Sequence, residues 1–152
     1  MNTPEGAAHT QPGHTPQPVD VDQPFDADQL YALRPTLAAH ASRHGAPEQQ
    51  IEHLITVATE LATNAIRHGG GTGRLRIWHH DTTFYCQVTD QGPGITDPAV
   101  GTTPPDPTNP YGGRGIWITR HLTNDLQIES GPDGRGTTIT AAIPRPNHPE
   151  EP

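Results

Sequence analysis

The side chains in this sequence that could act together chemically are Glu60 and Asn64. Residues four apart stack on one side of a helix, and the apolar residues of this region recur at helical spacing up to Gly69. Glu60 and Asn64 would therefore lie together, away from the apolar face. A carboxylate beside an amide can serve a metal ion and a nucleophile, although a solvated polar face that ends at a glycine explains the same residues. The apolar face consists of Ile51, Leu54, Ala58, Leu61 and Ala65.

Three glycine-bearing stretches follow this helix. They are Asp90–Gly94 (Asp-Gln-Gly-Pro-Gly), Gly112–Gly115 (Gly-Gly-Arg-Gly) and Gly136–Thr138 (Gly-Thr-Thr). One such stretch is weak evidence, because glycines also mark ordinary turns. Together with Glu60 and Asn64, the series resembles the Bergerat-type ATP-binding domain that gyrase, Hsp90, histidine kinases and MutL share. Its first motif, Glu-Leu-Ala-Thr-Asn-Ala-Ile-Arg-His-Gly, is similar to that of the anti-sigma factor serine/threonine kinases of Gram-positive bacteria.

The resemblance implies a site for the adenine of ATP around Asp90. The carboxylate would accept a hydrogen bond from the adenine amino group, and Gly92 and Gly94 would let the backbone approach the purine because they have no Cβ. Thr138 matches a position that supports this aspartate, although an ordinary strand residue would fit there as well. A plain turn after a strand is the alternative for the whole stretch.

The resemblance also implies a place for the phosphates and for Mg²⁺. Gly113 and Gly115 precede a predicted helix, whose free N–H groups and positive dipole end suit phosphate. Arg114 could add a charge-assisted contact or point to solvent. Asn64 matches the magnesium ligand of the family. Glu60 matches the carboxylate that polarises the attacking hydroxyl or water.

The order of predicted elements favours an α+β fold of the Bergerat type, a two-layer sandwich in which a mixed sheet carries helices on one face. Pro35 is expected to kink the first helix, because proline removes a backbone donor. The proline-rich stretch 96–111 is expected to form a lid, which lacks a lysine to grip phosphate. Helices are predicted over 26–44, from 46 to 69 and over 115–122, and strands over 73–80, 82–89, 125–130 and 137–143.

Composition indicates one domain with unpacked ends. The chain has 152 residues, of which 30% are hydrophobic and 18 are prolines. We expect a disordered tail over residues 1–24, a histidine-kinase-like ATP-binding domain over 25–144 and a second tail over 145–152. The end of the first tail, near Val19–Phe25, could add a short edge strand, because the resembled family often begins with one.

Several function classes are disfavoured. A net charge of -8 without any lysine argues against nucleic acid as a direct partner. No apolar run reaches membrane-spanning length and no signal segment is evident, so a soluble cytoplasmic protein is expected, with its single cysteine, Cys86, buried and inert. The ten histidines show no familiar ligand spacing, although His40 and His44 share a helix face, so a structural metal site among them is not expected. Asn64 is the metal ligand that the resemblance implies.

The resemblance therefore implies an ATP-binding regulatory protein, an anti-sigma factor serine/threonine kinase that phosphorylates an antagonist protein, sequesters a sigma factor, or does both. Whether it forms a homodimer is left open. One alternative is a catalytically silent nucleotide-binding module that acts by protein contact. Another is a histidine kinase catalytic domain. That activity requires a phosphoacceptor histidine followed by an acid on a dimerising helix pair, whereas His40 precedes Ala41 and His44 precedes Gly45.

Overall fold

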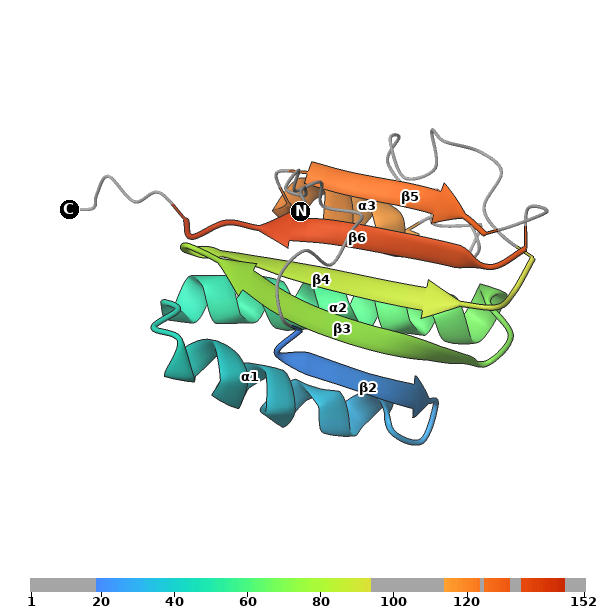
Figure 1. The fold of residues 1–152 in the computed structure, drawn as a ribbon, viewed down its shortest axis with the longest axis horizontal. Helices are drawn as coiled ribbons and strands as arrows, with labels where there is room; N and C mark the ends of the chain where they lie inside the picture. The colour runs from blue at the N-terminus through green and yellow to red at the C-terminus, as the bar shows by residue number, and fades with distance from the viewer. Residues whose placement is uncertain (1–18, 94–113, 124, 132–134, 147–152) are drawn as a thin grey trace, which may run out of the picture.

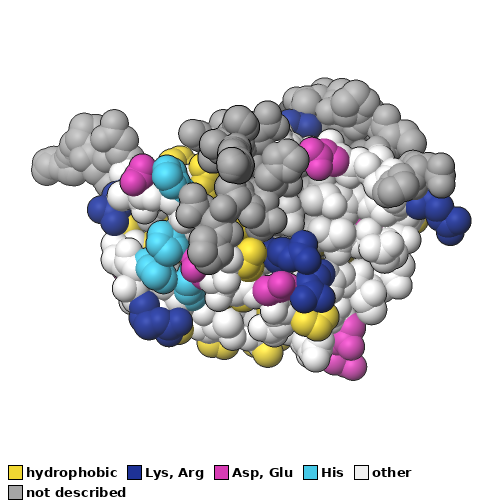
Figure 2. Space-filling view, in the orientation of Figure 1, with side chains coloured by type: hydrophobic (Ala, Val, Ile, Leu, Met, Phe, Trp, Pro, Cys, Tyr) yellow, Lys and Arg dark blue, Asp and Glu magenta, His cyan; other side chains and the backbone are white. Residues whose placement is uncertain are grey.

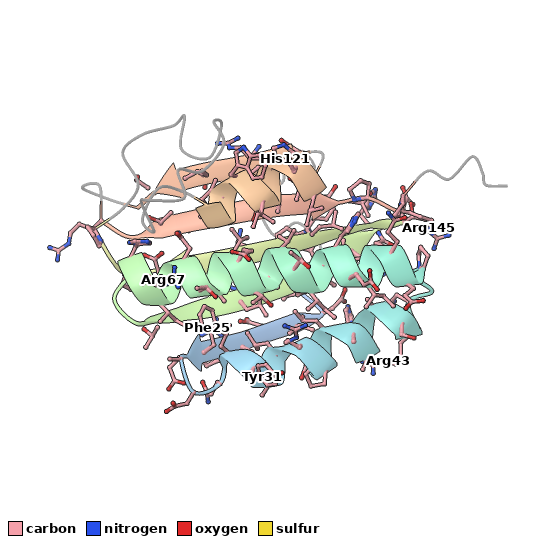
Figure 3. The ribbon with its side chains drawn as sticks, turned by 180° about the vertical axis from the view of Figure 1, so that it is seen from behind. Phe25, Tyr31, Arg43, Arg67, His121 and Arg145 are labelled. Carbon is pink, nitrogen blue, oxygen red and sulfur yellow. The ribbon has the colours of Figure 1, made fainter. Side chains whose placement is uncertain are left out.

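A five-stranded sheet that is covered on one face by three α-helices forms the fold (Figure 1). This computed structural model describes residues 19–93, 114–123, 125–131 and 135–146. Figure 3 shows the helices in front of the sheet when the molecule is seen from behind. The predicted α+β two-layer architecture is confirmed. None of the helices within these ranges has the length and apolarity to cross a membrane.

The elements begin with an edge strand and a pair of helices, which are followed by the rest of the sheet. In chain order they are β2 (Val21–Asp26), a 3₁₀ turn (Leu30–Ala32), α1 (Leu33–Arg43), α2 (Glu48–His68), β3 (Thr72–His80), β4 (Thr83–Asp90), α3 (Arg114–Leu122), β5 (Asp125–Ser130) and β6 (Thr137–Ile143). The predicted lid over 96–111 lies outside the described residues, as do residues 1–18 of the tail predicted over 1–24.

The sheet is antiparallel throughout, whereas the sequence had led us to expect a mixed sheet. Its strand order is β2-β3-β4-β6-β5, and every neighbouring pair is antiparallel. The segment containing α3 connects β4 to β5, two strands that run in the same direction, which is what a helical crossover normally does. However, β6 inserts between them, so these parallel strands never become neighbours.

Of two local predictions at the N-terminal edge, one is confirmed and one is corrected. The edge strand expected near Val19–Phe25 is present as β2, which is six residues long and pairs with β3 along its whole length. Pro35 does not interrupt a helix, because α1 begins at Leu33. Proline in the first helical turn lies where the backbone N–H has no partner within the helix, so the residue is tolerated there.

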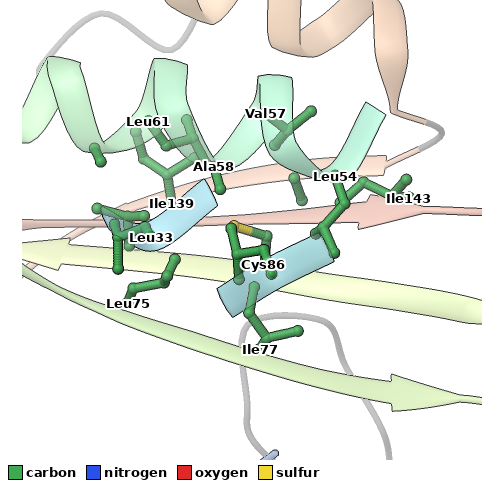
Figure 4. Close-up of a cluster of buried hydrophobic side chains, with 14 of the residues drawn as sticks. Leu33, Leu54, Val57, Ala58, Leu61, Leu75, Ile77, Cys86, Ile139 and Ile143 are labelled. Carbon is green, nitrogen blue, oxygen red and sulfur yellow. The ribbon is translucent and has the colours of Figure 1, made fainter. Parts of the chain in front are cut away.

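The core lies between the sheet and α2 (Figure 4). The helix turns its predicted apolar face to the sheet, and Leu54, Ala58, Leu61 and Ala65 are all at most 1% exposed, whereas Ile51 is half-buried. Small alanines let the helix axis approach β4 closely. Cys86 is fully buried beneath this helix, and burial raises the pKa of its thiol to about 12, so it stays a neutral core residue as predicted.

Gln50 fixes the first turn of α2 against the far end of the sheet. The side chain is 1% exposed, and its Nε2 donates to the carbonyl oxygen of Thr82 at 2.7 Å and of Ile143 at 3.0 Å. These carbonyls belong to the turn between β3 and β4 and to the last residue of β6. One buried amide therefore sets where α2 starts, and so where every later residue of that helix lies over the sheet.

We expect Gln50→Ala to lower the free energy of unfolding by about 1–3 kcal/mol, because two carbonyl groups lose their buried donor. Urea unfolding followed by circular dichroism measures this change. Glu52→Ala, on the exposed side of the same helix, is the matched control and should change stability by less than about 0.5 kcal/mol. Equal effects of the two substitutions would contradict the role assigned to Gln50.

Candidate functional site

Asp90 is a buried carboxylic acid at the end of a central strand. It is the last residue of β4 and only 7% exposed, and it faces the helix layer, as Val88 does. The backbone N–H of Gly92 donates to its Oδ1 at 2.9 Å. Burial raises the pKa of Asp90 above that of an ordinary carboxyl, while hydrogen bonds from the amides of Gly92 and Thr137 act in the opposite direction by stabilising the carboxylate.

The end of α2 meets Asp90 at a distance that only glycine permits. A Cβ added to Gly69 would lie 2.3 Å from Asp90 Cγ, and one added to Gly92 would lie 2.4 Å from the Cα of Gly69. We predicted that the missing Cβ of Gly92 would let a purine approach the backbone. In the structure, the group that approaches Gly92 is the backbone at the end of α2. Sequence reasoning treated Gly69 only as a helix stop and missed its contact with Asp90.

The start of β6 holds the other side of the Asp90 turn. Gly136 adopts a φ of +79°, and its N–H donates to the carbonyl oxygen of Gly92 at 2.6 Å. A Cβ on Gly136 would lie 2.8 Å from the backbone oxygen of Asp90, so a larger residue would be excluded by contact as well as by backbone conformation. The stretches that contain Gly92 and Gly136 are far apart in the sequence, but they are hydrogen-bonded to each other beside Asp90.

Thr138 lies on the other face of the sheet from Asp90. Its Oγ1 is 3.3 Å from the Oγ1 of Thr89, on the face away from the helices. The residue opposite Asp90 in the register is Thr137, which is buried. The position that adjoins the aspartate thus belongs to Thr137, one residue before the predicted one. Strict alternation from the buried core residue Ile139 would have indicated this, since residues two apart share a face.

Glu60 and Asn64 are both half-buried on α2, one turn apart, and the start of α3 packs against the first of them. A Cβ added to Gly115 would lie 3.0 Å from Glu60 Oε1, so the missing side chain makes room for the carboxylate. Gly115 is the second residue of α3, and the positive end of a helix stabilises a nearby negative charge. The structure therefore brings Glu60 and Gly115, which belong to two different sequence motifs, close together.

The described residues do not cover the entire predicted site. Gly94 and Gly113 lie outside them, as does the side chain of Arg114, the first residue of α3. Along α2, Gly69 lies nine residues beyond Glu60, which corresponds to about 13 Å of helix. Asp90, which contacts Gly69, and Glu60, which contacts the start of α3, thus lie at opposite ends of one elongated region.

The residues present fit a magnesium ion near Asn64. A hard divalent cation prefers oxygen ligands and usually keeps several waters, so an amide oxygen beside a carboxylate is a suitable donor set. Both side chains are half-buried, so neither is sealed inside the core.

Comparisons with known proteins identify the family of the chain. Residues 23–143 match the family described as histidine kinase-like ATPase domain. Anti-sigma F factor of Bacillus subtilis (strain 168) is 31% identical over 114 residues, covering 70% of this chain and 77% of that protein, and anti-sigma F factor of Bacillus licheniformis is 32% identical with the same coverage.

Solved structures share the fold at lower sequence identity. The chain superimposes on one from the SiaB-SiaC complex of Pseudomonas aeruginosa with a TM-score of 0.65 and 11% identity, covering 85% of this chain and 93% of that one. The mycobacterial sensor histidine kinase MprB gives a TM-score of 0.52 and 18% identity, with 82% and 97% covered. The family match, the relatives and the shared fold lead to one conclusion: this chain belongs to the histidine kinase-like ATPase domain family.

Proposed function

We propose that this protein is an ATP-dependent serine/threonine kinase of the anti-sigma factor type, which phosphorylates an antagonist protein and sequesters a sigma factor. The observation that carries the proposal is that α2 contributes to two chemically different places. Its C-terminal end meets the buried Asp90 through Gly69, and its middle presents Glu60 to the start of α3. An elongated ligand with a purine at one end and phosphates at the other fits this division.

Asp90 selects the base in this proposal. Its carboxylate is already desolvated and held by two backbone amides, so its orientation is fixed before a ligand arrives. A fixed acceptor discriminates in favour of adenine, whose exocyclic amino group donates, and against guanine, which presents a carbonyl at the corresponding position.

The part of α2 around Glu60 and Asn64 handles the phosphates in this proposal. Asn64 would hold Mg²⁺ through its amide oxygen, and the ion supplies charge neutralisation to the phosphates when it is bound. Gly113, Arg114 and Gly115 would contribute the N-terminus of α3 as a phosphate cradle. Glu60 would accept the hydrogen bond of the attacking serine hydroxyl and orient it in line with the terminal phosphate.

The partner class comes from the relatives. The Bacillus proteins are named anti-sigma F factors, so a sigma factor and its antagonist are the partners that we propose. The alternative, a nucleotide-binding module that works by protein contact without phosphate transfer, is favoured by the absence of lysine from the stretch 96–111. Substitution of Glu60 distinguishes the two hypotheses, because only the kinase needs its carboxylate.

We expect Asn64→Ala and Asp90→Asn each to weaken ATP binding in the presence of Mg²⁺ by at least about tenfold, the equivalent of losing one charge-assisted hydrogen bond. Calorimetric titration of the full chain measures this affinity. Asp81→Asn, in the exposed turn at the other end of β4, is the matched control, because asparagine tolerates the φ of +54° found there.

Thermal unfolding of the same variants checks that the fold persists. Burial raises the pKa of Asp90, so its ionised form at neutral pH is less favourable in the folded protein than in the unfolded chain. Asp90→Asn should therefore bind ATP poorly without lowering Tm. Wild-type protein that binds no ATP at millimolar concentration would overturn the nucleotide site.

Glu60→Gln should keep ATP binding but lower phosphate transfer by about 10²–10⁴-fold, because the amide cannot accept the hydroxyl proton. Transfer of label from [γ-³²P]ATP to serine in candidate antagonist proteins, together with ADP release, measures the step. Glu52→Gln on the exposed side of α2 should behave as wild type. If Glu60→Gln and wild type bind ATP equally and neither transfers phosphate, the silent module replaces the kinase.

A further inference from the structure

Four side chains of metal-ligand type meet at the end of the domain opposite Asp90. Each offers one ligand atom, and these atoms all lie within 4.8 Å of one another. Figure 2 shows histidine side chains gathered at the left of the view, where α1 and β3 end in Figure 1. The four residues, hereafter the His/Asp cluster, are Asp20, His40, His44 and His79.

The cluster is assembled from three separate segments. His40 lies in the last turn of α1 and His44 is the residue directly after that helix, four positions further on, the spacing at which two imidazoles can bind one ion. His79 is next to last in β3 and faces the helix layer. Asp20 directly precedes β2 and is positioned by its own N–H, which donates to the carbonyl oxygen of Ile77 at 2.8 Å. Spacing along the sequence could not have revealed this combination.

The distances are close to those of a tetrahedral site. Two ligands of one Zn²⁺ with bonds of about 2.0–2.1 Å are about 3.3 Å apart. Asp20 Oδ2 is 3.4 Å from His40 Nε2 and 2.6 Å from His79 Nδ1. The second distance is that of a direct hydrogen bond, so binding would separate this pair by somewhat less than about 1 Å. The ring of His44 lies between its neighbours, with centroids 4.5 Å from His40 and 4.2 Å from His79.

His40 supplies an independent reason to expect a ligand here. The residue is only 4% exposed, and its Nε2 is buried and makes no hydrogen bond among the described residues, although it points toward Asp20. A buried polar nitrogen without a partner is costly, and a bound cation would remove that cost.

We propose that the His/Asp cluster binds a divalent transition metal ion, with Zn²⁺ as the ligand that best matches three imidazoles and one carboxylate. Four protein ligands close a tetrahedral site, so the role is structural. The exposed His44 provides a route for the ion to enter. The ion would connect the chain before β2, the end of α1 and the end of β3.

This site is separate from the proposed nucleotide site. Phe84 is opposite His79 in the register of β3 and β4, and Asp90 lies six residues further along β4. Six residues of strand span about 20 Å, so no side chain can belong to both sites. The preferred ions differ too, because Mg²⁺ prefers oxygen ligands whereas the His/Asp cluster is mainly nitrogen.

The test is Zn²⁺ titration of tag-free full-length protein after chelator treatment, by calorimetry, with Co²⁺ absorption as a report of tetrahedral geometry. Wild type should bind one Zn²⁺ per chain and show a higher Tm with the ion. His44→Ala and His79→Ala should each weaken binding by at least about tenfold. His80→Ala, which removes the adjacent exposed imidazole on the other face of β3, is the matched control and should bind as wild type.

Two outcomes would overturn the proposal. One is the absence of Zn²⁺ binding by wild type, which would leave a hydrogen-bonded histidine cluster. The other is equal loss of affinity in His44→Ala and His80→Ala, which would indicate adventitious binding to surface imidazoles. His44 is exposed, so its substitution should not unfold the chain, and ATP binding with Mg²⁺ by His44→Ala serves as the check that the domain is intact.

Discussion

The contact between the end of α2 and the turn after β4 is the constraint on which the rest of the structure depends. Gly69 and Gly92 bring two backbones so close that a single Cβ on either would collide with the other segment or with Asp90. Gln50 anchors the same helix at its other end, against the last residue of β6. With both ends fixed to the sheet, α2 has no freedom to slide or rotate, so Glu60 faces the start of α3 as a consequence of packing.

This rigidity explains how the domain tolerates a buried carboxyl. Burial raises the pKa of Asp90, so its ionisation at neutral pH opposes folding, and that opposition fades as pH falls through the pKa and the group takes up a proton. The apolar contact between α2 and the sheet offsets the cost. Amides of Gly92 and Thr137 recover part of it by hydrogen bonding to the carboxylate. A residue that is unfavourable for stability yet held in place by its neighbours is the usual signature of a binding group.

Sequence reasoning succeeded where local patterns decide the structure and failed where long-range pairing does. The periodicity of α2 and the position of Asp90 at a strand end are local, and both were predictable. The antiparallel sheet depends on β6 inserting between β4 and β5, which no local pattern encodes. Thr138 was chosen by motif matching, although the alternation of β6 places Thr137 beside the aspartate. Pro35 was predicted to kink a helix because the start of α1 was placed too early.

The edge strand β2 shows why the His/Asp cluster matters to the fold. Pro24 lacks an N–H within a strand whose only described neighbour is β3. Asp22 pairs with Arg74 at 2.6 Å and Arg76 at 3.5 Å, but exposed ion pairs add little stability. Phe25, which is 2% exposed, anchors the strand near its end. At its start Val21 packs partly against the core, and the contacts of Asp20 lie just before it. An ion in the His/Asp cluster would add a link at this edge of the sheet, because its ligands come from the chain before β2, from the end of α1 and from β3.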